Sequence, residues 1–430
     1  MVLALLVVLA ALLYLNRRAA AREVLVGWLD RRGIEADVEV ERIELDGFVG
    51  RVRIGDADNP DVTVERVEVD YAVTGPWSER GLGVTPGRIR LVRPVLRASW
   101  RAGKLSLGSL DPLVEDFTGR PPSPDSRGPL VVVERGRLRL DTEYGPLQLL
   151  GDARIDDGKL MRLSASMPAA SLKSGDIEVR ALGGTLDMTT TGDRIAVRLD
   201  LGADRFAAAA TGGRNARLKL NGDLPYPDLK TRRGDGRARL DGELTAGALS
   251  SGDARVSDAR LQGRFDGATT GWIEAFHIEG ESLLDLTAGA LASPGLTARG
   301  VQATARGGKL ELDRGDEAFR WSLSAPTTIT AASGRSGEMD VSGLTLRSGG
   351  LVVGGRDDAF EATGPVAARI DRFGFGDLTL RQATGALELD VVHDAATRIS
   401  ATGSLRAAEG GWPIFGVPEA ADPADLVEMK

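Results

Sequence analysis

The feature that most constrains this chain is an apolar–polar alternation of period two, which recurs from residue 34 almost to the end. It is clear in Val67–Tyr71 (VEVDY), Ile195–Leu199 (IAVRL) and Leu310–Leu312 (LEL). A period of two places alternate side chains on opposite faces of a β-strand. Gly-Asp, Gly-Gly, Asp-Gly and Ser-Gly pairs, which favour tight turns, stand between these runs. The pattern predicts an all-β body with strands recurring roughly every 10 to 15 residues.

Composition excludes several classes of site. Cysteine is absent, and the two histidines, His277 and His393, lie far apart in the sequence. Disulfides, thiol nucleophiles and most zinc, haem and Ser-His-Asp chemistries are therefore ruled out or disfavoured. The net charge of −8, without a basic block, argues against a nucleic-acid partner. We expect no catalytic residues, no cofactor and no metal, and so no enzyme.

Some residues resemble reactive sites but have a simpler interpretation. Adjacent pairs such as Asp156-Asp157, Asp357-Asp358 and Glu134-Arg135 point to opposite faces of a strand, so they build no joint site. His277, between Phe276 and Ile278, is interpreted as structural or surface-exposed. The Gly-Asp repeats lack the spacing of calcium-binding nonapeptides. The six tryptophans either pack normally or line a groove: Trp28, Trp77, Trp100, Trp272, Trp321 and Trp412.

Residues 1–16 predict a transmembrane anchor. The uninterrupted apolar run ends at Asn16, Arg17 and Arg18, and as a helix it covers ~21 Å of a ~30 Å hydrocarbon core. A signal peptide and a buried core helix are the alternatives, and an anchor that has lost a few upstream residues fits best. Arginines after the run would by themselves favour a cytoplasmic body. The anchor residues are Val2, Leu3, Leu5, Leu6, Val7, Val8, Leu9, Leu12, Leu13, Tyr14 and Leu15.

Residues 17–33 predict a short amphipathic helix that ends at Gly33, a usual residue after a helix C-terminus. One interpretation is that its apolar face caps the first end of the β-structure. The other is that it lies on a bilayer surface, with arginines contacting lipid phosphates. The residues concerned are Arg18, Arg22, Val24, Leu25, Trp28 and Leu29.

The remaining chain divides into four predicted segments. Residues 34–118 form a first β-segment that ends in a short helix at Ser109–Thr118, and the proline-rich 119–129 forms a loop. Residues 130–415 continue as a long repetitive β-region. Asp422-Pro423 resembles a helix start, so 416–430 is expected to begin a helix that is cut short.

Small inward residues favour an open sheet over closed domains. Sandwiches of this size need more large apolar residues, and propellers show a fixed repeat signature that is missing here. Alanine, valine, leucine and glycine dominate, so an elongated, twisted sheet folded into an apolar groove is predicted. Candidate lining residues are Val38, Val40, Val62, Val64, Ile89, Leu91, Leu138, Leu140, Ile195, Val197 and Leu199.

The order of these segments resembles a known family. The anchor, the basic helix, VEVERIELDGFVGRVRIGD (Val38–Asp56) and VTVERVEVDYAV (Val62–Val73) are similar to the N-terminal part of AsmA-like envelope proteins, and most of all to the YdbH group. GLGVTPGRIRLVRPVLRASW (Gly81–Trp100) and GPLVVVERGRLRL (Gly128–Leu140) fit the same style. The resemblance implies an inner-membrane anchor, a chorein-like N-terminal helix and a periplasmic β-groove (β-taco-like) for phospholipids, with no catalytic residues.

The leading hypothesis is a single-pass protein of the bacterial inner membrane whose periplasmic groove shields acyl chains. Its expected partners are phospholipids, the inner membrane and a protein on the outer-membrane side. Two alternatives remain: an envelope scaffold that docks partner strands at a sheet edge, and a secreted β-rich protein that acts on glycans.

Overall fold

The computed structural model describes most of the chain between residues 26 and 429. The described residues are 26–27, 30, 33–44, 46–74, 83–101, 104–112, 128–228, 233–272, 275–315, 318–357, 359–394, 397–411 and 427–429. The chain divides into two compact units, the first made of residues 1–175 and 180–192 and the second of 176–179 and 193–430. Nearly every described residue is in a strand, so the all-β prediction is confirmed.

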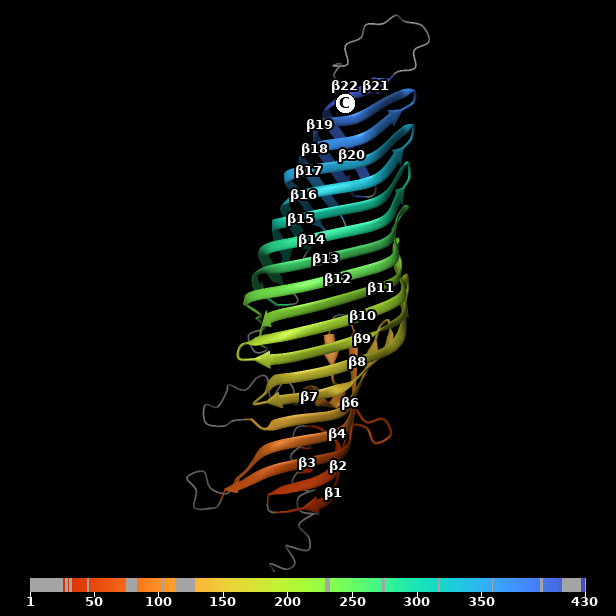
Figure 1. Cartoon of the computed structure of the whole chain (residues 1–430). Coiled ribbons are helices and arrows are strands. Elements are labelled where there is room, and N and C mark those ends of the chain that lie inside the picture. Colours follow the sequence, from red (N-terminus) through yellow and green to blue (C-terminus); the bar gives the residue numbers. More distant parts are fainter. Residues whose placement is uncertain are drawn as a thin grey trace, which may run out of the picture. The chain divides into compact units, whose positions relative to one another are not determined.

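The first unit is an antiparallel meander with one interruption (Figure 1). Strands β1 to β4 pair in sequence order, and β6, β7 and β8 do the same. β4 and β6 pair in parallel, so the chain crosses over between them. The elements are β1 (Ala36–Ile43), β2 (Gly47–Ile54), β3 (Val62–Thr74), β4 (Gly83–Arg101), β5 (Lys104–Ser106), the 3-10 helix η1 (Gly108–Leu110), β6 (Leu130–Thr142), β7 (Gly145–Asp156), β8 (Lys159–Ser174) and β9 (Ile177–Thr191), which straddles the unit boundary.

The crossover begins with the 3-10 turn η1, and Asp111 and Pro112 after it are helical, within the stretch Ser109–Thr118 where a short helix was expected. η1 is fixed by Asp61, whose carboxylate accepts hydrogen bonds from the backbone N–H of Ser109 (2.8 Å) and from its hydroxyl (2.7 Å). The Asp111 carboxylate likewise accepts hydrogen bonds from the Ser106 hydroxyl and from the Leu107 N–H. Residues 113–127, which carry the rest of the predicted helix and most of the proline-rich loop, lie outside the described residues.

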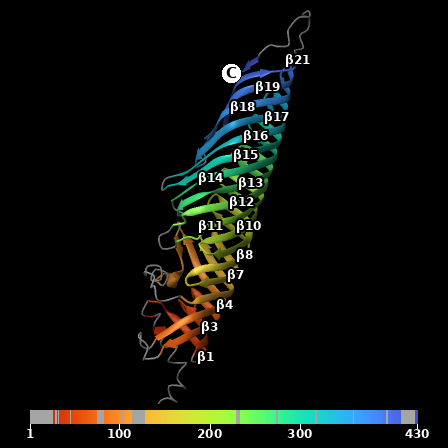
Figure 2. The ribbon, with the colours of Figure 1, turned by 60° about the vertical axis from the view of Figure 1, so that its left-hand side comes forward.

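The second unit repeats one connection, in which each strand turns back and pairs with the next strand along the chain. Consecutive strands from β10 to β20 pair antiparallel with their sequence neighbours and lie side by side, bent along their length (Figures 1 and 2). The strands are β10 (Arg194–Ala208), β11 (Thr211–Pro225), β12 (Gly236–Ser251), β13 (Ala254–Gly271), β14 (Phe276–Ser293), β15 (Leu296–Arg314), β16 (Phe319–Ser336), β17 (Met339–Arg356), β18 (Ala359–Phe375), β19 (Leu378–His393), β20 (Thr397–Arg406), β21 (Glu409–Gly411) and β22 (Val427–Met429).

These strands are longer than the sequence pattern predicts. β13 has 18 residues and β15 has 19, although we expected a new strand every 10 to 15 residues or so. In many strands the apolar–polar alternation changes phase partway along the strand. In the sequence, such a change inside one strand resembles the boundary between two separate strands. The register between β1 and β2 shifts between Val40 and Arg42, as at a β-bulge.

Where they are described, the C-terminal end of the chain differs from the prediction and the N-terminal end agrees with it. Val427–Met429 form β22, which pairs with Gly403–Leu405 of β20, because the edge of a sheet offers unpaired backbone groups to a nearby segment. This is not the helix expected within 416–430. At the other end, Val26, Gly27 and Asp30 are helical, and Gly33 follows with φ of +72°.

Candidate functional site

The long strands of the second unit carry different chemistry on their two faces. In β13, Arg260, Arg264 and Asp266 lie on one face, whereas Leu261 and Phe265 lie on the other. The partners of these residues in the neighbouring strand β12 have the same character, because Asp241 pairs with Arg264 and Leu240 with Phe265. The period-two alternation therefore produces a charged face and an apolar face.

On the apolar face, one row of cross-strand neighbours runs through eleven strands, β10 to β20. Every member is apolar or glycine, and each is the direct partner of the next. Direct partners have Cβ atoms about 5 Å apart, so their side chains form a continuous surface. The members of this leucine row are Leu201, Leu218, Leu244, Leu261, Leu286, Ala303, Ile329, Leu346, Ala368, Gly385 and Leu405.

A second apolar row runs through the same strands as far as β19 and then continues into β21. Its members are also apolar or glycine, and each again pairs directly with the next. The members of this second row are Phe206, Gly213, Leu249, Val256, Leu291, Ala298, Gly334, Val341, Phe373, Leu380 and Gly410.

Left-handed residues between the two rows bring them onto one face. The rows are five positions apart in each strand, as at Leu261 and Val256, and an odd separation places side chains on opposite faces of a regular strand. Every second strand has one residue with positive φ between the rows, for example Asp258 at +49°. The apolar–polar alternation changes phase at these residues, whereas the pairing register between neighbouring strands is the same before and after them. This left-handed column consists of Asn215, Asp258, Gly300, Gly343 and Gln382.

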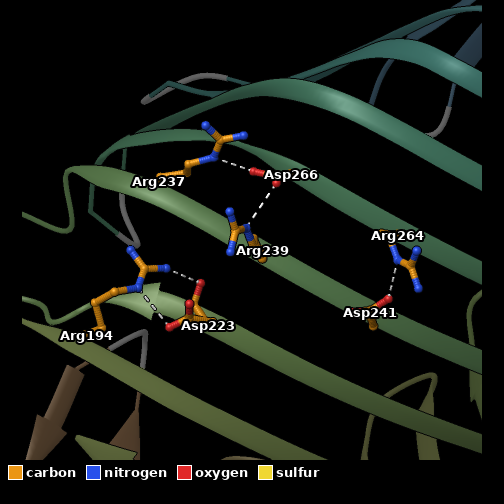
Figure 3. A network of polar contacts seen from close by, with 7 residues as sticks. All are labelled: Arg194, Asp223, Arg237, Arg239, Asp241, Arg264 and Asp266. Atoms are coloured by element: carbon orange, nitrogen blue, oxygen red, sulfur yellow. Dashed lines mark hydrogen bonds and ion pairs between the residues drawn. The ribbon is translucent and has the colours of Figure 1, made fainter. Parts of the chain in front are cut away.

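The opposite face is held by cross-strand ion pairs (Figure 3). The Asp266 carboxylate accepts hydrogen bonds from Arg237 Nε (2.6 Å) and Arg239 Nε (3.0 Å), and Asp223 accepts one from Arg194 (2.9 Å). The hydrogen bond from Arg237, together with the positive charges of both arginines, holds the pKa of Asp266 below its usual value. We call these cross-strand ion pairs the charged ladder. All of their side chains are substantially exposed, so the ladder contributes more to the register between strands than to the stability of the fold.

Unit 1 carries apolar rows that contain most of the residues predicted to line a groove. Val62 and Leu138 belong to one row, Val40 and Leu91 to a second, and Ile89 to a third. Val38 and Val64 flank Val52 in a shorter row, and Leu140 lies between Ala98 and Leu147. The three longer rows are Ala36–Ile54–Val62–Leu96–Leu138–Leu149, Val40–Gly50–Val67–Leu91–Val133–Ala153–Leu163 and Ile43–Phe48–Val69–Ile89–Val131–Ile155–Leu160.

The same phase change occurs in unit 1. Arg93 in β4 has φ of +50° and Arg135 in β6 has φ of +53°, and each lies between two apolar residues five positions apart. On the polar face, Arg90 binds the Glu134 carboxylate through two hydrogen bonds (2.8 and 2.7 Å) and Glu68 through one (3.1 Å). Burial raises the pKa of Glu68, but the hydrogen bonds from Arg90 and Arg66 outweigh it and leave the pKa lowered.

The predicted lining residues of β10 also have apolar partners. Ile195 pairs with Leu224, Val197 with Gly222 and Leu199 with Leu220. Sequence reasoning missed the leucine row as a unit, because the alternation identifies the apolar side of each strand but not which residues of different strands meet. A signal was available, since Leu218, Leu261 and Leu286 each stand among charged or polar neighbours in an alternating run.

The residues predicted for membrane contact fall outside the described part of the chain. These are the eleven anchor residues from Val2 to Leu15 together with Arg18, Arg22, Val24, Leu25, Trp28 and Leu29. Within the described residues, no helix has the length and apolar character needed to cross a bilayer.

The residues weighed as reactive sites are used structurally. Asp157 accepts a hydrogen bond from the Gly128 N–H (2.6 Å) and Asp357 accepts one from the Phe319 N–H (3.2 Å), both at turns. His277 lies at the surface, 3.5 Å from Asp313, and His393 stacks on Phe360. Across the described residues, no cluster of His, Asp and Glu side chains has the geometry of a metal site.

Comparison with known proteins identifies the family. A family model described as "YdbH-like: Intermembrane phospholipid transport protein YdbH" matches residues 4–317, well over half of the chain. Comparisons with curated proteins and with solved structures gave no match. The family match and the long all-β sheet agree with each other, and the resemblance read from the N-terminal third extends well into the second unit. The chain therefore belongs to the YdbH-like family of intermembrane phospholipid transport proteins.

Proposed function

We propose that this protein carries phospholipids between two membranes along the apolar face of its sheet, which folds into a groove around their acyl chains. The observation that carries the proposal is the leucine row, an uninterrupted apolar surface across eleven strands. In this proposal the leucine row and the second row form the two walls of the groove, and the left-handed column lies between them.

The dimensions favour acyl chains as the ligand. Strands ~4.8 Å apart give a row about 48 Å long over ten steps, whereas one leaflet of tails spans about half of the ~30 Å hydrocarbon core. Several tails therefore fit end to end along the row. Each methylene that leaves water contributes about 0.8 kcal/mol, so a surface of leucine and alanine binds tails without a specific polar site.

Exposure along the row supports binding rather than internal packing. Leu244 and Leu286 are 38% and 39% exposed, although both belong to an apolar surface whose neighbours are also apolar. Large apolar side chains left open in a continuous row are typical of a surface that binds something else. A tail lying along the row covers them, and the charged head group stays in water at the open side.

The proposal includes a location. Residues 1–16 anchor the chain in the inner membrane, residues 17–33 adjoin the bilayer, and the β-body lies in the periplasm, where its far end meets a protein of the outer-membrane side. Because the chain has no cysteine, a cysteine placed at Thr287 is the only thiol available for labelling. We expect a membrane-impermeant maleimide to label it once the outer membrane alone is permeabilised. Labelling that needs lysis of the inner membrane would refute a periplasmic body.

Photo-crosslinking tests lipid binding directly. A photoreactive amino acid at Leu244 or Leu286 should capture phospholipid in cells, because both side chains point from the apolar face. The matched controls are Thr245 and Thr287, the next residues in each strand, which face the other way. Equal lipid capture at leucine and threonine positions contradicts the proposal. Protein adducts in place of lipid at all four positions would support a scaffold instead.

A further inference from the structure

The apolar face is not equally open along its length. In the leucine row, Leu244 and Leu286 are well exposed, whereas Ala368 and Leu405 are only 4% exposed. The second row shows the same change, because Leu249, Val256 and Leu291 are half-buried but Phe373 and Leu380 are buried. Between β14 and β18 the leucine row therefore passes from exposed to buried, and the second row passes from half-buried to buried.

The buried residues come from both sides of the left-handed column. Ala368 and Leu405 of the leucine row, Phe373 and Leu380 of the second row, and Ile370 and Ala383 between the rows form one hydrophobic cluster. This cluster therefore joins the two rows across the left-handed column at β18–β20. Met339, Val341, Leu344 and Leu346 of β17 pack against the same cluster.

The residues between the two rows differ in size along the sheet. In β12, β13, β14 and β16 these positions hold alanine, at Ala246, Ala259, Ala288 and Ala331. In β17 and β18 they hold Leu344 and Ile370, which pair directly. The alanines are buried as well, but Leu344 and Ile370, together with the ring of Phe373, place more apolar volume between the rows at β17–β18 than alanine does.

Another buried phenylalanine on the apolar face behaves differently. Phe265 packs beside glycines of its own sheet, since a methyl group added at Gly280 would lie 2.9 Å from its ring. It is not part of the cluster that joins the two rows. Phe265 is thus a matched control for Phe373, with the same residue type and similar burial.

We infer that the β17–β20 segment is a constriction in the lipid path, closed by Ile370, Phe373, Leu380 and Leu405. This inference rests on the proposed function. Acyl chains occupy the face along β10–β16, and they pass β17–β20 only when these side chains move apart. The constriction sets how far bound lipid travels along the sheet and makes passage slower than binding.

Photo-crosslinking on both sides of the transition tests the constriction in the full-length protein in cells, read out as phospholipid adducts by mass spectrometry. The photoreactive amino acid is placed at Leu286 in the open part and at Leu387, which packs against the cluster. We expect lipid capture at Leu387 to be several-fold weaker than at Leu286. Phe373→Ala should raise capture at Leu387 towards the level at Leu286, and Phe265→Ala should not.

The outcomes separate this inference from the proposed function. No lipid adduct at Leu286 refutes lipid binding itself. Strong capture at Leu286 and equal capture at Leu387 in the unaltered protein refutes the constriction alone, as does a folded Phe373→Ala variant with unchanged capture at Leu387. If Phe373→Ala fails to fold, the milder Phe373→Leu and Leu405→Val provide the same comparison with smaller expected increases.

Discussion

At the scale of single residues, the left-handed positions have the largest consequence for function. Asp258 has φ of +49°, a conformation that costs most residues ~1–2 kcal/mol but is more accessible to Asp and Asn. Its carboxylate lies close above Gly289 of the next strand, where a Cβ would be 3.0 Å from the oxygen. One backbone conformation thereby puts Val256 and Leu261 on the same face of β13.

Asp258→Val should therefore destabilise the second unit by about 1–3 kcal/mol, because a β-branched side chain is strained at positive φ. The urea midpoint of unfolding measures the effect. Ser257→Val is the control, since Ser257 is its neighbour without positive φ. Asp258→Gly should be tolerated. Equal losses at 257 and 258 would show that the backbone conformation is not the cause.

At the scale of paired strands, the charged ladder fixes which residues meet. Asp241 and Arg264 are direct cross-strand partners with a 2.7 Å hydrogen bond, and Arg217 binds both carboxylate oxygens of Asp200. A slip of one residue would turn the leucines towards the charged face and break these pairs together. Register is thus specified from both faces of the sheet.

The ladder predicts a stability difference that depends on pH. The pKa of Asp266 is lowered in the folded protein, mainly by the hydrogen bond from Arg237. A lowered pKa gives stability that is fully present above the unfolded value of about 3.9 and is lost as pH falls through the folded value. Near neutral pH, the urea midpoint of unfolding should therefore be higher for the unaltered protein than for Asp266→Asn. The two midpoints should become equal in acid.

High salt should also reduce the difference in urea midpoint between the unaltered protein and Asp266→Asn, because salt screens exposed ion pairs. Asp253→Asn, in the turn between β12 and β13, is the comparison outside the ladder. A difference for Asp266→Asn that persists unchanged in acid and in high salt would mean that the carboxylate acts through packing.

At the scale of the whole second unit, each long strand contacts mainly its two sequence neighbours. Such an array behaves as a one-dimensional repeat, in which stability is a sum over neighbouring pairs. The leucine row crosses every pair from β10 to β20, so the apolar row and the sheet extend together. The constriction at β17–β20 is the place where this uniformity ends.

Deletion of residues 276–318, which carry β14, β15 and the following turn, should leave a folded protein. It places β16 beside β13 in the same register, with Ile329 where Leu286 stood and Ala332 where Gly289 stood. Circular dichroism should retain the β-signal, and a photoreactive residue at Leu244 should still capture lipid. Aggregation of this variant, with folding retained in a variant that lacks only residues 229–232, would contradict the repeat description.

The alternation allowed the strand content and the apolar side of each strand to be predicted, because period two is a local property of the chain. Val62, Leu91 and Leu138 were assigned to an apolar surface on this basis, and they lie in apolar rows. Strand length was not predictable, since positive φ at Asp258 or Arg135 changes the phase without any breaker residue.

The sequence by itself determined that this protein is a long β-sheet with one apolar and one charged face, and it carried enough family pattern to indicate phospholipid transport. Tertiary structure alone decided that Leu218, Leu244, Leu261 and Leu286 form one row, and that residues of both rows share one buried cluster at β18–β20. The physical reason is that the face on which a side chain lies follows from the residues two positions away in its own strand. The register between strands, and the contacts between residues of different strands, depend instead on residues separated by whole strands.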